Sequence, residues 1–128
     1  MNEFTILAIV TIITALMWVP YVLDRISRQG LLVTVGYPEV PAQSPWAERA
    51  KRAHANAIEN LVVFATLLII LYLQGAFDPL TLLASKIYGV ARFVHFFVYM
   101  LRIPWLRTLA YFAGFAAQMM LAVKIFAS

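Results

Sequence analysis

Two groups of polar side chains recur at helical spacing inside otherwise apolar stretches of this chain. Their members are Arg49, Arg52, Asn56 and Glu59 in the first group, and Tyr88, Arg92, His95, Tyr99 and Arg102 in the second. At about 100° per residue, each group falls on one stripe of a helix. An Arg, Lys or Asp in the middle of a spanning helix costs about 2.5–3.5 kcal/mol on insertion scales, so such residues normally face the interior and mark function. We expect the two stripes to meet across a helix–helix contact.

The chemistry of these stripes combines cations and hydrogen-bond donors with one deep carboxylate, Glu59. The only histidines are His54 and His95, which make a poor metal set, so no metal is expected. Cysteine is absent, which excludes a cysteine nucleophile, and neither a Gly-rich phosphate loop nor a G-x-S-x-G motif occurs. The set therefore suits a small zwitterionic ligand with several negative charges.

A structural interpretation of the same residues is the alternative. The basic side chains that fit interfacial positions are Arg28, Lys51 and Arg102. Glu48 can pair with Arg52 at a spacing of four residues. His95 and Tyr99, taken singly, would be ordinary core residues, and their alignment with Arg92 is what favours function. Glu59 needs a partner in either case, namely a cation, a ligand amine or another subunit.

The segments that carry the stripes are apolar enough to be membrane helices. The 128 residues are 63% hydrophobic and 12% charged, against about 45–50% and about 25% in a soluble domain. A spanning helix needs about 20 residues, so four of them use most of the chain. The predicted helices lie at about 4–24, 45–74, 79–101 and 105–126. We expect one all-α domain over residues 1–128, an integral membrane four-helix bundle.

Breakers and charges refine this organisation. Residues 30–45 are predicted to be the longest loop, irregular because of four breakers: Gly36, Pro38, Pro41 and Pro45. Ser44 before Pro45 and Asp78 before Pro79 predict the starts of the second and third helices.

The net charge of +4 gathers at helix ends and not on one soluble face, so we do not expect nucleic acid as a partner. The bases beside the first and third connections are Arg25, Arg28, Arg49, Lys51, Arg52, Arg102 and Arg107. The positive-inside rule then places both connections in the cytoplasm and both termini outside.

Residues 48–60, ERAKRAHANAIEN, resemble the signature of the membrane-associated proteins in eicosanoid and glutathione metabolism (MAPEG). The likeness is closest to the branch of microsomal glutathione transferases and microsomal prostaglandin E synthases. Residues 91–95, ARFVH, with Tyr99 four residues on, are similar to the family's third-helix motif, and Arg107 resembles the arginine that opens its fourth helix. The resemblance implies a homotrimer, with glutathione as co-substrate bound between neighbouring subunits at the cytoplasmic side.

The resemblance also implies a role for each matching residue. The implied glutathione ligands are Arg28, Arg52, Asn56, Glu59, His95 and Tyr99. Arg107 would stabilise the thiolate, because an adjacent cation lowers a thiol pKa that is ordinarily about 8.5. The thiolate would attack a lipophilic electrophile, or reduce a lipid hydroperoxide, that arrives from the bilayer. The implied activity is that of a membrane-bound glutathione transferase or peroxidase.

Three departures from the family pattern leave alternatives. Ala55 stands where the prostaglandin synthases have an arginine, and Ala57 stands where many relatives have an aspartate. Both differences argue against prostaglandin synthase activity. The spacing from Tyr99 to Arg107 is one residue shorter than in the mammalian enzymes, which leaves Arg102 as the other candidate for the thiolate. Two further functions remain open: a non-catalytic trimeric membrane protein, and a small transporter or lipid-binding protein.

Overall fold

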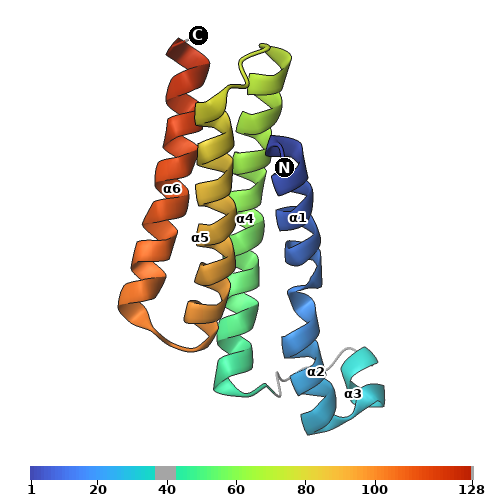
Figure 1. Ribbon diagram of the computed structural model, residues 1–128. Coiled ribbons are helices and arrows are strands. Elements are labelled where there is room, and N and C mark those ends of the chain that lie inside the picture. Colours follow the sequence, from blue (N-terminus) through green and yellow to red (C-terminus); the bar gives the residue numbers. More distant parts are fainter. Residues whose placement is uncertain (37–42, 128) are drawn as a thin grey trace.

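The computed structural model describes residues 1–36 and 43–127, and Figure 1 shows the course of the chain. Every regular element in these two ranges is a helix. The helices are α1 (Glu3–Leu16), α2 (Trp18–Gln29), α3 (Leu31–Val35), α4 (Pro45–Leu73), α5 (Pro79–Met100) and α6 (Pro104–Ala127). The all-helical class expected from the sequence is confirmed.

Four helical segments are long and apolar enough to cross a membrane. They are Glu3–Gln29, which joins α1 and α2, and the whole of α4, α5 and α6. Their outward faces expose many large apolar side chains, for example Ile12, Val62, Phe93 and Phe112. A soluble monomer rarely exposes so much contiguous apolar surface. The described residues therefore contain four candidates for the four spans expected from the sequence.

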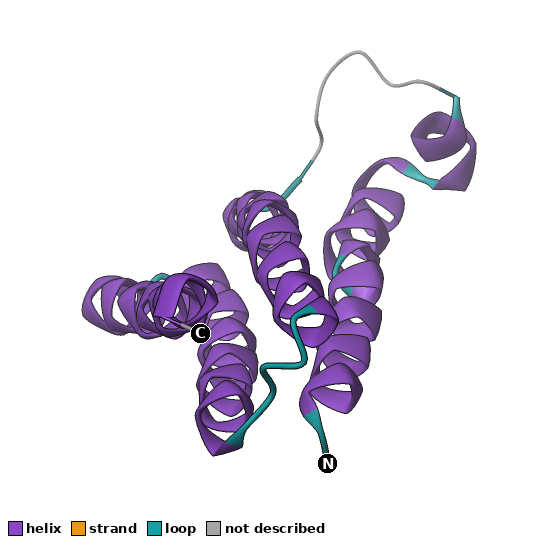
Figure 2. Cartoon of the chain, turned by 90° about the horizontal axis from the view of Figure 1, so that it is seen from above, coloured by secondary structure: helices purple, strands orange, loops and turns teal. Residues whose placement is uncertain are grey.

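The four spans lie side by side, as Figure 1 shows, and α3 lies beside one end of the bundle. One end of the bundle holds the C-terminus and the turn between α4 and α5, and the N-terminus lies nearer to this end. The turn between α5 and α6 lies at the other end. The view along the bundle in Figure 2 separates α6 from α1. Helix α5 is the most enclosed of the four and packs against α1, α4 and α6.

The core divides into two parts along the bundle. The larger cluster joins α1, α4, α5 and α6, and its centre is the stacked pair Phe64 and Tyr88, with ring centroids 4.0 Å apart. The smaller cluster places Ala50, Ala53 and Ala57 of α4 against Met17 and Phe96. Small side chains allow helix backbones to approach closely in membranes, which explains why this part of α4 is rich in alanine.

The first span differs from the continuous helix predicted at 4–24. It breaks at Met17, whose backbone N–H donates to the Thr14 carbonyl at 3.2 Å, and α2 then continues to Gln29. Pro20 accounts for the break, because it has no N–H to donate to the carbonyl four residues earlier. Tyr21 Oη lies 2.7 Å from His54 Nδ1, so α2 is attached to α4 beyond the break.

The predicted loop at 30–45 also contains more structure than expected. Residues 31–35 are apolar except for Thr34 and form the short helix α3, which follows Gly30 at a φ of +87°. Only glycine adopts such a backbone conformation without strain, so Gly30 permits the sharp change of direction after α2. Pro38 and Pro41, two of the predicted breakers, lie outside the described residues.

Ser44 occupies the N-cap position of α4, as predicted, but its side chain does not cap the helix. The Ser44 backbone N–H and hydroxyl both donate to the Asp24 carboxylate, at 2.7 and 2.8 Å. Arg28 Nη1 donates to the same hydroxyl at 3.2 Å. The start of α4 is therefore tied to the end of α2.

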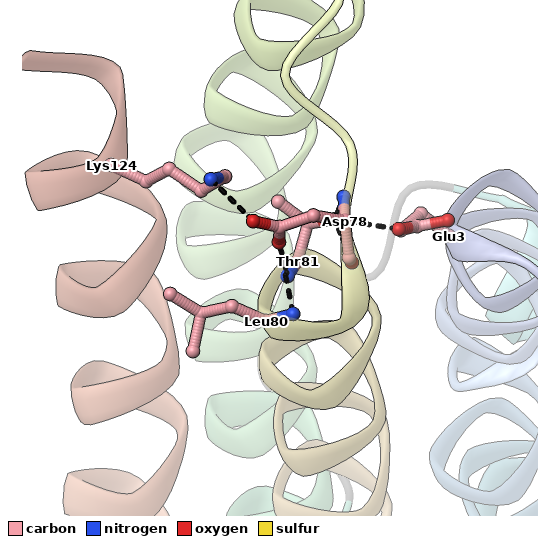
Figure 3. A network of polar contacts seen from close by, with 5 residues as sticks. All are labelled: Glu3, Asp78, Leu80, Thr81 and Lys124. Carbon is pink, nitrogen blue, oxygen red and sulfur yellow. Dashed lines mark hydrogen bonds and ion pairs between the residues drawn. The ribbon is translucent and has the colours of Figure 1, made fainter. Parts of the chain in front are cut away.

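Asp78 caps α5 through a capping box, accepting from the backbone N–H groups of Leu80 and Thr81 at 2.9 and 3.1 Å. Lys124 Nζ donates to Asp78 Oδ2 at 2.6 Å, and the Thr81 hydroxyl donates to buried Glu3 Oε1 at 2.6 Å (Figure 3). We call Glu3, Asp78, Thr81 and Lys124 the paired cluster. It connects α1, α5 and α6 at the end of the bundle where the termini lie. The hydrogen bond from Lys124 holds the pKa of Asp78 below its ordinary value.

Candidate functional site

One face of α5 carries polar side chains into the interior of the bundle. Tyr88 is fully buried, and Arg92 and His95 are only 3% and 2% exposed. Tyr88 Oη, Arg92 Nε and His95 Nδ1 are buried and have no hydrogen-bond partner within residues 1–36 and 43–127. Most buried polar atoms in proteins are paired, so three unpaired atoms on one helix face mark an unusual site.

The two polar stripes meet at one contact, and a second contact joins the stripe of α4 to the backbone of α5. Arg92 Nη2 of α5 donates to Asn56 Oδ1 of α4 at 2.6 Å. Closer to the end of the bundle, Arg49 Nε of α4 donates to the Met100 carbonyl at 2.9 Å. The second contact satisfies one of the carbonyls that the last turn of α5 leaves free, which is a structural role for Arg49.

A pocket of about 320 Å³ opens beside the first of these contacts. Its lining comes from α4, α5 and α6, and consists of Asn56, His95, Tyr99, Arg107, Thr108, Tyr111 and Phe112. We call it the donor pocket, because hydrogen-bond donors dominate its polar lining. A hollow between α1 and α5 is of similar volume, about 290 Å³, but Lys86 has the only charged side chain in its lining, and the other side chains are apolar. The donor pocket is therefore the better candidate for chemistry.

Arg107 is the cation of the donor pocket. It lies in the first turn of α6, and its Cζ is 5.1 Å from the centroid of the Tyr99 ring. The His95 ring lies 5.6 Å from that of Tyr99 and 6.2 Å from that of Tyr111. The start of a helix carries partial positive charge, which adds to that of the guanidinium.

No carboxylate lines the donor pocket, and the single ion pair among the described residues joins Lys124 to Asp78 in the paired cluster. Arg107 is exposed and has no acidic partner in the described part of the chain. An unpaired cation surrounded by hydroxyl, amide and imidazole groups can bind an anion and stabilise a thiolate.

Four of the seven site residues expected from the sequence lie together in this pocket: Asn56, His95, Tyr99 and Arg107. Arg28, at the end of α2, contacts Ser44 and not the pocket. Arg52 and Glu59 are exposed on α4 and do not contribute to the lining. Arg102 lies in the turn after α5 and is likewise exposed outside the lining.

Two residues of α4 lack, within one chain, the partners considered for them from the sequence. Glu48 and Arg52 form no ion pair among the described residues, and Glu59 is exposed, so its expected partner is not a described residue of the same chain. At about 100° per residue, Glu59 lies about 160° around the helix from Ala57, which is buried against the core. The contact that buries the alanine face of α4 therefore leaves Glu59 on the opposite side.

Apart from Arg107, the residues that α6 contributes to the site were not predicted from the sequence. Thr108, Tyr111 and Phe112 line the donor pocket, and Gln118 is a buried polar residue farther along the same helix. Arg107, Tyr111 and Gln118 are spaced by four and seven residues, which places them on one face of a helix. That spacing, together with an amide inside an apolar run, was the available signal.

Comparison with known proteins gives consistent matches. The model of the MAPEG family matches residues 4–127. The microsomal glutathione S-transferase 1 of Rattus norvegicus is 32% identical over 82 residues, which are 63% of this chain and 53% of that protein. The protein of the same name from Mus musculus matches to the same extent. The chain thus spans about half the length of the curated relatives it matches.

Proposed function

The chain belongs to the MAPEG family, and on that premise we propose that it is a membrane-bound glutathione transferase with glutathione peroxidase activity. The observation that carries this proposal is the donor pocket, in which Arg107 lies over Tyr99 with no carboxylate in the lining. The relatives named microsomal glutathione S-transferase 1 support glutathione as the co-substrate.

The proposed chemistry begins with the glutathione thiol. Arg107 and the N-terminus of α6 favour the thiolate, while Asn56, His95 and Tyr99 hold the peptide. The thiol proton passes to water. The thiolate sulfur then attacks the electrophilic carbon of, for example, an aryl halide, and a carbon–sulfur bond forms as the halide leaves. With a lipid hydroperoxide, the thiolate takes one oxygen to give a sulfenic acid and an alcohol. A second glutathione then yields the disulfide and water.

We further propose that the functional unit is a homotrimer, with glutathione between neighbouring subunits. The support comes from α4, where Arg52 and Glu59 are exposed on a helix that is long and apolar enough to span a membrane. Glu59 lies about 21 Å along the helix from Pro45, at 1.5 Å per residue. A carboxylate at that depth is costly against lipid. A neighbouring subunit would cover it, and Arg28, Arg52 and Glu59 would then complete the site.

The proposed orientation places the donor pocket on the cytoplasmic side and both termini outside. Three basic residues lie at the end of the bundle that contains the turn between α5 and α6: Arg102 and Arg107 beside the turn, and Arg49 against the last turn of α5. The C-terminus lies at the other end (Figure 1). The positive-inside rule assigns the basic end to the cytoplasm. In this proposal residues 1–128 form a single transmembrane domain.

The test uses the purified protein in detergent or nanodiscs. Glutathione should raise the unfolding temperature, since a ligand at 100 times its Kd adds about 2.7 kcal/mol of stability. S-hexylglutathione should also stabilise it, and turnover of an aryl halide and of a lipid hydroperoxide should depend on glutathione. Absence of stabilisation by both ligands, together with absence of turnover, would reject the proposed function.

A further inference from the structure

A chain of hydrogen bonds crosses the bundle beside the donor pocket, from α6 through α4 to α5. Gln118 Nε2 donates to the Asn60 carbonyl O at 3.1 Å, and Asn60 Nδ2 donates to the Asn56 carbonyl O at 2.9 Å. Arg92 Nη2 completes the series by donating to Asn56 Oδ1 at 2.6 Å. We call Gln118, Asn60, Asn56 and Arg92 the amide chain. Asn56 belongs both to this chain and to the lining of the pocket.

The donor character of Arg92 decides which way the Asn56 amide points. An amide side chain has a donor end and an acceptor end, and its neighbours determine which end faces which side. A guanidinium has no acceptor, so only the amide oxygen can face Arg92. The Asn56 Nδ2 group makes no hydrogen bond to any described residue. It is therefore the end of Asn56 that remains available to a ligand.

The Arg92 guanidinium is buried beside a neutral partner, which is energetically unfavourable. Arg92 is 3% exposed, and its partner through Nη2 is a neutral amide and not a carboxylate. Burial of a charge without a counter-ion carries a large desolvation penalty. Gly114 of α6 lies against the stem of Arg92, where a Cβ would be 3.5 Å from Arg92 Cδ. The surroundings therefore hold the guanidinium in place beside Asn56.

We propose that Arg92 is a positioning residue, which fixes the Asn56 amide so that its NH₂ group donates to a carboxylate of glutathione. This inference rests on the proposed function and deepens it. The donor pocket then recognises the anionic groups of the peptide, because its lining contains Arg107 and the Asn56 NH₂ group and no acid. The ammonium group of glutathione binds outside this lining.

The Asn56→Asp variant separates positioning from simple helix attachment. Aspartate has the same shape and is a better partner for Arg92, so the contact between α4 and α5 should persist and the unfolding temperature should not fall. The variant loses the NH₂ donor and adds a negative charge to the pocket. We expect glutathione to bind about 10- to 100-fold more weakly, the loss typical of one hydrogen bond to a charged group. If the pair were purely structural, only the added charge, which Arg92 offsets, would act on the ligand, and a loss of less than about threefold would overturn the donor role.

Variants of Arg92 test the positioning step itself. In Arg92→Gln the new amide can donate or accept, so only the longer contact from Asn60 Nδ2, 3.3 Å from Asn56 Oδ1, still favours this orientation. Binding should weaken about five- to tenfold. KM for glutathione should rise while kcat changes little, because Arg107 is untouched. Arg92→Lys keeps a charged donor and should recover part of the affinity. For the Asn56→Asp variant, Asn2→Asp is the matched control, since it makes the same substitution and adds the same charge at the exposed N-cap of α1.

Calorimetry with glutathione analogues identifies the group that Asn56 contacts. The glycyl ethyl ester and the analogue without the γ-glutamyl α-carboxylate each lack one anion, and the desamino analogue lacks only the amine. The wild-type protein should lose affinity for one of the two carboxylate analogues, and Asn56→Asp should show no further loss with that analogue. The loss of affinity on going from glutathione to the desamino analogue should be the same in the wild-type protein and in Asn56→Asp.

The outcomes distinguish this inference from the proposed function. If the wild-type protein does not bind glutathione, the proposed function fails and this inference fails with it. If the wild-type protein binds but Asn56→Asp and Arg92→Gln bind equally well, only the positioning role is overturned. Should Asn56→Asp unfold, the Asn56 side-chain ¹⁵N signal of the wild-type protein decides the matter. An unchanged signal on addition of glutathione would reject the donor role.

Discussion

In the paired cluster Lys124 binds Asp78 and Thr81 binds Glu3, whereas in the donor pocket Arg107 has no acidic partner among the described residues and His95 Nδ1 is unpaired. Both regions bring polar groups from several helices of the same bundle together. In the paired cluster these groups satisfy one another and connect three helices. In the donor pocket the donors are left for a ligand. Under the proposed function, polar groups contribute to stability in the paired cluster and to binding in the donor pocket, because an unpaired buried polar group costs stability.

The two regions also end their helices differently. After α4 the chain turns through Gly75 at a φ of +66°, and after α5 it turns through Arg102 at a φ of +62°. Both turns contain the same closing bond, from Ala76 N–H to the Leu71 carbonyl at 3.0 Å and from Ile103 N–H to the Val98 carbonyl at 2.9 Å. Glycine adopts this left-handed conformation freely, whereas any other residue pays for it. The strain therefore lies near the donor pocket and not near the paired cluster.

The largest expected effect comes from removing the cation of the donor pocket. Arg107→Ala should lower turnover about 10²–10³-fold while much of the glutathione affinity remains, because Asn56, His95 and Tyr99 still bind the peptide. Arg107→Lys should recover part of the activity, since the charge is kept and the planar fork is lost. Thiolate absorbance in the ultraviolet and turnover of an aryl halide provide the measurements.

Lys86→Ala is the control for the Arg107 series, because it also removes one exposed cation but lies on α5 away from the donor pocket. It should retain wild-type turnover. Normal thiolate formation by Arg107→Ala at neutral pH would transfer the stabilising role to another cation, and Arg102 would be examined next.

The next effect concerns stability and belongs to the paired cluster. Thr81→Val removes the hydroxyl between Glu3 and the capping box of α5 without changing the size of the side chain. A buried acceptor left without its donor costs about 1–3 kcal/mol, so the free energy of unfolding should fall by that amount. Thr81→Ser should restore most of it. Equilibrium unfolding in mixed micelles measures the change, and glutathione affinity should be unaffected. Equal stability of the valine and wild-type proteins would contradict the role of this contact.

A smaller pair of opposite effects is expected at the two turns. Gly75→Ala should destabilise the protein by about 1 kcal/mol through backbone strain alone, because no atom lies within 4 Å of a Cβ at this position. Arg102→Gly should relieve similar strain, and its gain of up to about 1 kcal/mol is reduced by the greater freedom of glycine in the unfolded chain. Unfolding measurements on both variants check the signs. A loss of stability in Arg102→Gly would mean that the arginine side chain offsets its own strain.

The smallest effect is a dependence on acid pH at the exposed ion pair. Lys124 lowers the pKa of Asp78, so the folded protein binds fewer protons at this carboxylate than the unfolded chain does. The stability from the pair is fully present above the ordinary aspartate pKa of about 3.9, and it is lost as the pH falls through the lowered folded value. The difference in Tm between wild type and Lys124→Gln should therefore be constant near neutral pH and shrink below about pH 4. A difference that grows on acidification would refute this account.

Local features of the sequence determined the helices and their starts. Asp78 with Pro79 and Ser44 with Pro45 mark the starts of α5 and α4, because capping and the fixed φ of proline depend on adjacent residues only. The polar stripes were also visible, since a period of 3.6 residues follows from the chain itself. The break at Met17 was accessible from Pro20 but was missed because the apolar run continues through it.

The tertiary structure decided which members of each stripe meet. Asn56 contacts Arg92, whereas Glu59, three residues later, is exposed, and periodicity alone cannot separate them because both lie on the same broad stripe. Only the docking of α5 against the alanine face of α4 selects one and leaves the other. The pairs Glu3 with Thr81 and Asp24 with Ser44 likewise join residues far apart in the chain. A helical period specifies the direction of a side chain, but the partner in that direction is set by packing of the whole bundle.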